Sequence, residues 1–212
     1  MRRIRIVVAY DGTNYCGWQI QPNGITIEEI LNRQISKLTG EDIRIIGASR
    51  TDSGVHALGN VAVFDTESRI PGDRFAYALN QKMPEDIVIV RSDEVQIDWH
   101  PRYQNEISKT YEYHIYNAKV RNPLKNRYST FVSFDLDVEK MRQGAKYILG
   151  EHDFASFCNV RTNAKDTVRT VHEITIKEIP MDKFQASNWG QENSNLENEK
   201  EIVICVTGNG FL

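Results

Sequence analysis

The chain has few cysteines and no long hydrophobic run, and both absences limit what it can be. Its 212 residues include only three cysteines, which stand far apart without CxxC spacing. This pattern favours free thiols in a reducing compartment over a disulfide framework. No apolar run approaches the roughly 20 residues of a membrane-spanning helix, and the N-terminal MRRIRIVVAYDG has no signal-peptide cleavage site. We therefore expect a soluble, cytoplasmic protein with no membrane partner.

Motifs that bind metals or nucleotide phosphates are also absent. The histidines are His56, His100, His114, His152 and His172. They show no HExxH or other metal-ligand spacing, and no GxxxxGK[ST] or GxGxxG run is present to hold phosphates. GEHDF, residues 150–154, is interpreted as a loop. Ser49 and Ser53 near His56 are more typical of a surface loop than of a catalytic triad. We expect no metal and no cofactor.

Positive charge is not in excess, because 26 Lys and Arg stand against 29 Asp and Glu, for a net charge of -3. A nucleic-acid-binding domain is usually basic as a whole, so an anionic partner would need a local patch. One basic run lies between His100 and Thr130. Its cations are Arg102, Lys109, Lys119, Arg121, Lys125 and Arg127. Six positive charges against Glu106 and Glu112 leave +4, which fits either a solvated edge or a binding surface.

Hydrophobic periodicity predicts the order β-α-β-β-α-β in the first half of the chain. The expected elements are a strand over 4–10, a helix over 26–40, strands over 43–49 and 60–65, a helix over 72–81 and a strand over 86–95. The first helix has the clearest ends. Thr26 and Glu29 fit a capping box, and Gly40 fits a helix stop.

A second cycle of the same kind follows. Its expected elements are a strand over 109–116, a helix over 138–149 that ends at Gly150, and strands over 168–179 and 201–207. The intervening segment 179–200, rich in Asn, Glu and Ser, is predicted to be a mobile surface excursion. Two split β-α-β halves, residues 1–105 and 106–212, predict an α+β fold of two ferredoxin-like halves with abutting antiparallel sheets and a central cleft. The second half ends after β-α-β-β.

Asp52 lies in the polar loop SRTDSGVH, and the residues alone leave two interpretations open. TDSG suits a turn, because Asp caps its own backbone and Gly54 accepts a positive φ. The other interpretation is a catalytic carboxylate, for which Arg50 supplies a neighbouring positive charge that favours the ionised form.

Five segments spread over almost the whole chain carry a resemblance to a known family. They are AYDGTNYCGWQIQ (9–21), GASRTDSGVHA (47–57), WHPRYQNEISKTYEYHIYN (99–117), LGEHDFASFC (149–158) and GNGFL (208–212). In order and spacing they resemble the TruA family of tRNA pseudouridine synthases. The resemblance implies isomerisation of uridine to pseudouridine at positions 38, 39 and 40 in the anticodon stem-loop of tRNA. It also implies a homodimer that needs no cofactor.

The resemblance implies roles for single residues as well. Asp52 corresponds to the catalytic aspartate and is the expected nucleophile, and Arg50 would help to hold the extruded nucleotide. Tyr111, the first tyrosine of KTYEY, matches the aromatic residue that packs on the target base. Expected tRNA contacts from the basic run are Arg102, Lys109, Arg121 and Lys125.

Two alternative functions remain open, and the sequence departs from the family pattern at its C-terminal end. The chain could be a non-catalytic tRNA-binding or folding protein of the same fold. An RRM-like module shares the β-α-β-β-α-β order, but no RNP1 aromatic pattern is present. The family pattern continues past GFL into a segment whose arginine helps to hold the aspartate, whereas this sequence stops at Leu212. We therefore expect a C-terminally incomplete chain with low activity.

Overall fold

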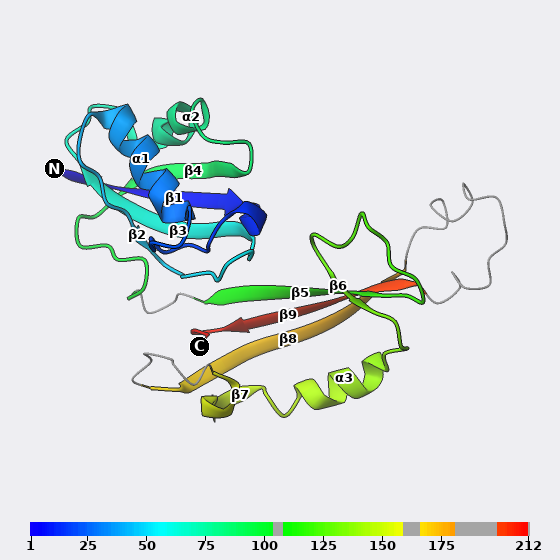
Figure 1. The fold of residues 1–212 in the computed structure, drawn as a ribbon. Helices are drawn as coiled ribbons and strands as arrows, with labels where there is room; N and C mark the ends of the chain where they lie inside the picture. Colours follow the sequence, from blue (N-terminus) through cyan, green and yellow to red (C-terminus); the bar gives the residue numbers. More distant parts are fainter. Residues whose placement is uncertain (104–107, 159–165, 181–198, 212) are drawn as a thin grey trace. The chain divides into compact units, whose positions relative to one another are not determined.

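A computed structural model describes residues 1–103, 108–158, 166–180 and 199–211 (Figure 1). The chain divides into two compact units, Met1–Ile107 and Ser108–Leu212. Each unit contains its own sheet, with strand order β2-β3-β1-β4 in the first and β6-β5-β9-β8-β7 in the second. The predicted α+β class with one sheet in each half is confirmed, while the cleft between the halves stays a prediction. No helix among these described residues has the length and apolar content needed to span a membrane.

In the first unit, two helices cover one face of a four-stranded antiparallel sheet (Figure 1). Its elements are β1 (Arg2–Tyr10), η1 (Gly12–Asn14), α1 (Ile27–Thr39), β2 (Ile46–Gly47), β3 (Ala57–Thr66), η2 (Gly72–Arg74), α2 (Phe75–Asn80) and β4 (Ile87–Val95). The central strand β1 alternates, so that Ile4, Ile6 and Val8 are fully buried. Because a strand has a period of two, this one face of β1 forms the floor of the core beneath α1 and α2.

The ends of α1 follow from its sequence. The Thr26 hydroxyl accepts a hydrogen bond from the Glu29 backbone N–H at 3.3 Å, a cap that contributes about 1 kcal/mol. Gly40 ends the helix at φ 77°, in the left-handed region that glycine adopts without steric strain. Both predicted helix ends are therefore confirmed.

The strand expected over 43–49 is wrong in length, since β2 is only Ile46–Gly47. The Ile43 N–H donates to the Ser36 hydroxyl at 3.0 Å, and the Ile45 N–H donates to Asn32 Oδ1 at 2.9 Å. Both acceptors are side chains of α1. These N–H groups are therefore committed to the helix and are not available for a strand ladder.

The second unit has a five-stranded sheet with α3 on one face (Figure 1). Its elements are β5 (Lys109–Asn117), β6 (Thr130–Val132), α3 (Val138–Ala145), β7 (Gly150–Asp153), η3 (Ala155–Phe157), β8 (Val168–Pro180) and β9 (Lys200–Gly208). Strand β9 lies between β5 and β8 and is antiparallel to both. A small core of Ile115, Val138 and Ile202 joins α3 to the sheet.

Three expectations for this unit need correction. GEHDF, interpreted as a loop, begins with β7, which pairs with β8, and β6 was not expected at all. The helix expected over 138–149 ends at Ala145, because the N–H groups of 146–148 bond to carbonyls three residues back, as in successive turns. The excursion predicted for 179–200 lies mostly outside the described residues.

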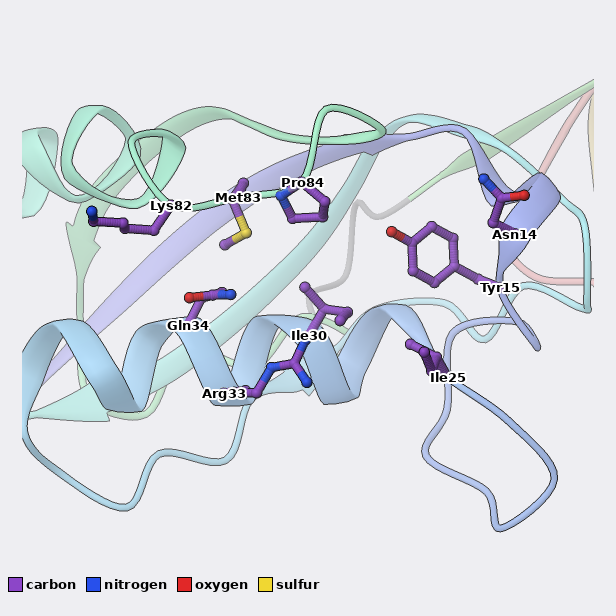
Figure 2. A pocket seen from close by; sticks show the side chains of 9 residues that line it. All are labelled: Asn14, Tyr15, Ile25, Ile30, Arg33, Gln34, Lys82, Met83 and Pro84. Atoms are coloured by element: carbon purple, nitrogen blue, oxygen red, sulfur yellow. The ribbon is translucent and has the colours of Figure 1, made fainter.

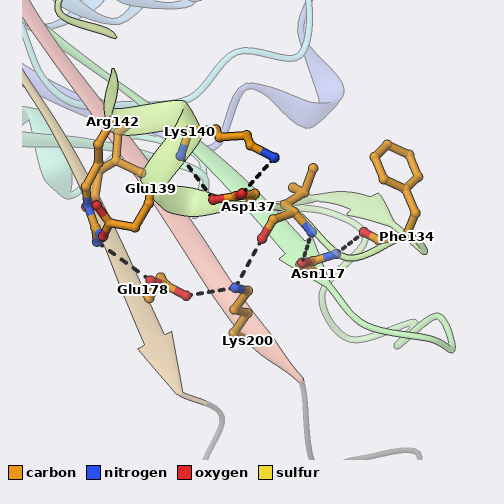
Figure 3. Close-up of polar contacts among 10 residues, drawn as sticks. Asn117, Phe134, Asp137, Glu139, Lys140, Arg142, Glu178 and Lys200 are labelled. Atoms are coloured by element: carbon orange, nitrogen blue, oxygen red, sulfur yellow. Dashed lines mark hydrogen bonds and ion pairs between the residues drawn. The ribbon is translucent and has the colours of Figure 1, made fainter. Parts of the chain in front are cut away.

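Polar contacts fasten α3 to the strands beside it (Figure 3). The Arg142 guanidinium donates to the Ile176 carbonyl oxygen on β8, with 3.0 Å for Nη2. Lys200 Nζ on β9 lies 2.7 Å from Glu178 Oε2 on β8. Asn117, which is buried, donates to the Phe134 carbonyl oxygen at 2.8 Å and so anchors the segment that leads into the helix. The small apolar core of this unit is thus supplemented by side-chain hydrogen bonds.

Candidate active site

Asp52 lies in the loop 48–56, which connects β2 to β3. The Val55 N–H donates to the Asp52 carbonyl oxygen at 3.2 Å, and Gly54 has φ 79°, so the predicted turn is present. The side chains of Asp52 and Arg50 are both exposed. Within the part of the chain that the structure describes, neither side chain makes a hydrogen bond or ion pair. The carboxylate therefore owes its position to the backbone of its loop and is not paired with Arg50 in this structure, whereas the role of Arg50 at the extruded nucleotide stays a prediction.

A second loop, residues 11–18, packs directly against this turn. The Trp18 N–H donates to the Thr51 carbonyl oxygen at 3.0 Å, and the Gly54 N–H donates to the Tyr15 carbonyl oxygen at 3.3 Å. The Ser53 hydroxyl donates to the same Tyr15 oxygen at 3.2 Å. The residues immediately before and after Asp52 are therefore hydrogen-bonded to one neighbouring loop.

Glycine permits this close approach of the two loops. Gly17 has φ 81°, and a Cβ built on it would lie 2.6 Å from the Thr51 carbonyl oxygen. A Cβ on Gly12 would lie 2.1 Å from the Val55 carbonyl oxygen. Since real Cβ atoms essentially never come within 3.0 Å of a heavy atom outside their own residue and its chain neighbours, both positions require glycine.

The aromatic residues of the 11–18 loop serve packing. Tyr15 and Trp18 are 7% and 1% exposed and belong to the core of the first unit. The Tyr15 hydroxyl donates to Asp86 Oδ1 at 2.6 Å, and burial together with this hydrogen bond raises the pKa of Tyr15. The sequence identified this motif but did not show that it supports the Asp52 loop.

Side chains also anchor the loop from beneath. The hydroxyls of Tyr10 and Thr51 lie 2.8 Å apart, and Asn60 donates to the Ser49 carbonyl oxygen at 3.2 Å. At the far end, His56 Nδ1 accepts the Gly12 N–H at 3.1 Å and lies 3.0 Å from an Asp11 carboxylate oxygen. The loop that carries Asp52 is therefore fixed at its beginning, middle and end.

Tyr111 lies in the other unit, on β5. Its ring contacts Phe211 edge to face, with 4.6 Å between centroids, and its side chain remains 37% exposed. Phe211 belongs to the GNGFL segment, so two of the five motifs meet here. Because Asp52 and Tyr111 belong to different units, their joint action on one base stays a prediction.

The four expected basic contacts differ in their surroundings. Arg102 Nε donates to the Gly47 carbonyl oxygen at 2.7 Å and so ties the segment after β4 to β2. Lys125 Nζ pairs with Glu201 at 3.1 Å, whereas the Arg121 guanidinium lies 5.1 Å from the centre of the Phe131 ring. Lys109 begins β5. Arg102, Lys125 and Arg121 therefore each have a partner within the protein.

Metal-ligating side chains do not gather in either unit. Among the residues that the structure describes, no group of three or more His, Cys, Asp or Glu side chains is arranged to hold a metal ion.

Comparison with known proteins gives one consistent family. The family model described as tRNA pseudouridine synthase matches residues 6–104 and 145–212. A tRNA pseudouridine synthase A of Acetivibrio thermocellus is 47% identical over 191 residues, 90% of this chain and 78% of the relative. Proteins of the same name from Brevibacillus brevis and Ruminiclostridium cellulolyticum are 44% and 45% identical over 100% of this chain and 79% of their own lengths.

Proposed function

Because the chain belongs to the tRNA pseudouridine synthase family, it is an isomerase of tRNA uridines, and we propose that Asp52 is its catalytic nucleophile. One observation supports this role: the carboxylate is exposed, while the loop that carries it is held in place by hydrogen bonds at Thr51, Ser53 and Gly54. A target nucleotide must leave its stack before an enzyme can act on it. An exposed carboxylate on a fixed backbone suits such a flipped substrate.

The reaction itself needs only the atoms of the substrate and a carboxylate. Attack of Asp52 on C1′ breaks the C1′–N1 bond and leaves uracil as an anion, as in a retaining glycosidase. After the base turns, C5 attacks C1′ and releases Asp52; C5 then loses its proton and N1 gains one. The alternative route, removal of the C2′ proton to give a glycal, uses a carboxylate at the same position.

The remaining roles belong to the same proposal. Tyr111 stacks on the target base, since its ring is partly exposed and aromatic faces suit nucleobases. Arg50 contacts the extruded nucleotide. The tRNA backbone is contacted by the four cations of the basic run, Arg102, Lys109, Arg121 and Lys125. The targets are positions 38, 39 and 40 of cytoplasmic tRNAs, and a homodimer lets one tRNA contact both subunits. Because A-form stems hide their base edges, recognition rests on backbone and shape.

Asp52→Asn tests the central assignment. The substitution deletes the reacting charge and keeps the shape of the side chain, so pseudouridine formation should fall by several orders of magnitude. Affinity for tRNA should change by no more than a few-fold. The assay maps pseudouridine by chemical labelling of an unmodified tRNA transcript, which also reports the modified positions.

A matched control is Asp42→Asn, which removes the same charge from another exposed position of the first unit and should leave turnover unchanged. Near-normal turnover by Asp52→Asn would remove Asp52 from the chemistry. A wild-type chain that binds tRNA but forms no pseudouridine would instead favour the non-catalytic alternative.

A further inference from the structure

A pocket of about 370 Å³ lies in the first unit (Figure 2), and Asp52 is not among the residues that line it. It is bounded by the first turns of α1, by the 11–18 loop and by residues 82–84 after α2. Ile30, Met83 and Pro84 give it an apolar wall, and Arg33 and Lys82 give it positive charge. Its volume falls at the lower end of the range of roughly 300 to 1,000 Å³ for small-ligand sites, but much of its boundary is open to solvent, so it is a surface hollow and not an enclosed cavity.

The walls of the pocket are fixed by hydrogen bonds of the fold. Ile30 and Arg33 are one helical turn apart on α1 and therefore lie on the same face (Figure 2). The Met83 N–H donates to the Leu79 carbonyl oxygen at 3.1 Å, which continues the last turn of α2. Tyr15 is held by its hydrogen bond to Asp86. The pocket is thus present before any ligand binds.

Within the described ranges, the two cations of the pocket lack hydrogen-bond and ion-pair partners, a property that they share with other exposed cations such as Lys37 and Arg69. The side chains of Arg33 and Lys82 are exposed, and neither forms a hydrogen bond or ion pair with any residue in the described ranges. By contrast, Lys125 and Lys200 are paired with glutamates. Two exposed cations beside an apolar wall suit a phosphate joined to an apolar group, and arginine can bind phosphate through two parallel hydrogen bonds.

The pocket is also joined to the loop of Asp52. The Tyr15 side chain lines the pocket, and the Tyr15 carbonyl oxygen accepts hydrogen bonds from Ser53 and Gly54. A ligand in the pocket therefore rests on the same loop that fixes the candidate nucleophile.

We infer that this pocket binds one nucleotide of the tRNA outside the reacting position, with its phosphate on Arg33 and Lys82 and its sugar and base on Met83 and Pro84. The inference rests on the proposed function for the identity of the RNA. A tRNA nucleotide is favoured over a free nucleotide because the pocket wall is part of the loop that supports Asp52.

The test is the salt dependence of tRNA affinity for the wild type and the double variant Arg33→Gln/Lys82→Gln. Each lost phosphate contact lowers the slope of log K against log salt by about 0.7 to 0.9. Because the two cations share one phosphate, the double variant should bind roughly 5- to 8-fold more weakly at about 0.1 M salt. The control Lys37→Gln/Arg69→Gln removes one lysine and one arginine that are exposed and do not line the pocket. It should bind within about twofold of the wild type.

A second variant separates contact from folding. Arg33→Lys keeps the charge and should retain the wild-type slope, and all variants are compared by their urea unfolding midpoints. A slope for the double variant equal to that of the control overturns the inference. So does binding of uridine 5′-monophosphate that the double variant loses while its tRNA affinity stays unchanged, because the pocket would then be a free-nucleotide site.

Pseudouridine formation by the wild type on the same transcript is scored separately. If no pseudouridine forms, the proposed function fails, and the slopes still decide whether the pocket contacts RNA. If pseudouridine forms and the slope of the double variant matches that of its control, the pocket inference alone fails.

Discussion

Replacing Gly17 with alanine tests whether the 11–18 loop determines the position of Asp52. The change introduces two separate penalties. Gly17 has φ 81°, a left-handed conformation that costs an L-residue about 1 to 2 kcal/mol. The new Cβ would also lie 2.6 Å from the Thr51 carbonyl oxygen and 3.2 Å from the Asp52 carbonyl carbon. Both of these atoms are backbone, so the clash cannot be relieved by a side-chain rotation.

The size of the required movement follows from these distances. Ordinary contact begins at 3.4 Å, so the 2.6 Å approach must open by about 0.8 Å. Overpacking of this kind costs about 1 to 3 kcal/mol, in addition to the left-handed conformation. A displacement of about 1 Å at a reacting group can reduce turnover by roughly 100-fold. We therefore expect Gly17→Ala to lose both stability and turnover, with little effect on tRNA affinity.

Gly40→Ala is the matched control. Gly40 has φ 77°, close to that of Gly17, but a Cβ there meets nothing within 4 Å. It should lose about 1 kcal/mol of stability from the backbone conformation alone, and it should keep full turnover. Urea unfolding and single-turnover pseudouridine formation measure the two effects. If Gly17→Ala loses no more turnover than Gly40→Ala, the contact between the loops does not position Asp52.

Two further predictions concern the second unit. The hydrogen bond from His114 and, to a smaller extent, the interaction with Lys125 lower the pKa of Glu201 below its ordinary 4.5. The contribution of ionised Glu201 to folding stability is therefore complete above pH 4.5 and is lost as the pH falls through the lowered pKa. In Glu201→Gln, the urea unfolding midpoint should therefore fall less steeply at acid pH than in the wild type. The control Glu173→Gln, at an exposed position, should keep the wild-type pH dependence. An unchanged acid dependence in Glu201→Gln would contradict this. Tyr111→Ala should reduce turnover more than Tyr111→Phe, since only Phe keeps the contact with Phe211; equal losses would assign the effect to the hydroxyl alone.

The parts of the fold that the sequence predicted well depend on neighbours along the chain. Thr26 caps α1 through an N–H three residues away, and Gly40 ends the helix through its own backbone conformation. The alternation of Ile4, Ile6 and Val8 likewise expresses a property of a single strand. Such local signals are complete within a short stretch of sequence, so they need no knowledge of the rest of the fold.

The errors arose where distant residues compete for the same groups. Residues 43–45 have strand-like composition, but the side chains of Asn32 and Ser36 take the N–H groups of a potential ladder. The sequence also could not show that Glu201 lies 3.1 Å from Lys125, and the expected tRNA contact of Lys125 stays a prediction. Composition records a charge or a propensity, whereas the outcome depends on which partner arrives from elsewhere in the chain.

The candidate site depends both on a local sequence motif and on contacts between segments that are distant in the sequence. The motif SRTDSGVH identifies Asp52, yet in the described part of the chain no side chain forms a hydrogen bond or ion pair with the carboxylate. Its position is determined by backbone bonds from Trp18 and to Tyr15, and α1 separates that loop from Asp52 in the sequence. Glycine at 17 therefore matters to the chemistry because it lets two backbones meet, although glycine contributes no reactive group. For this site the residues most informative about catalysis after Asp52 are those that shape the loop beside it, and spacing within one motif cannot identify them.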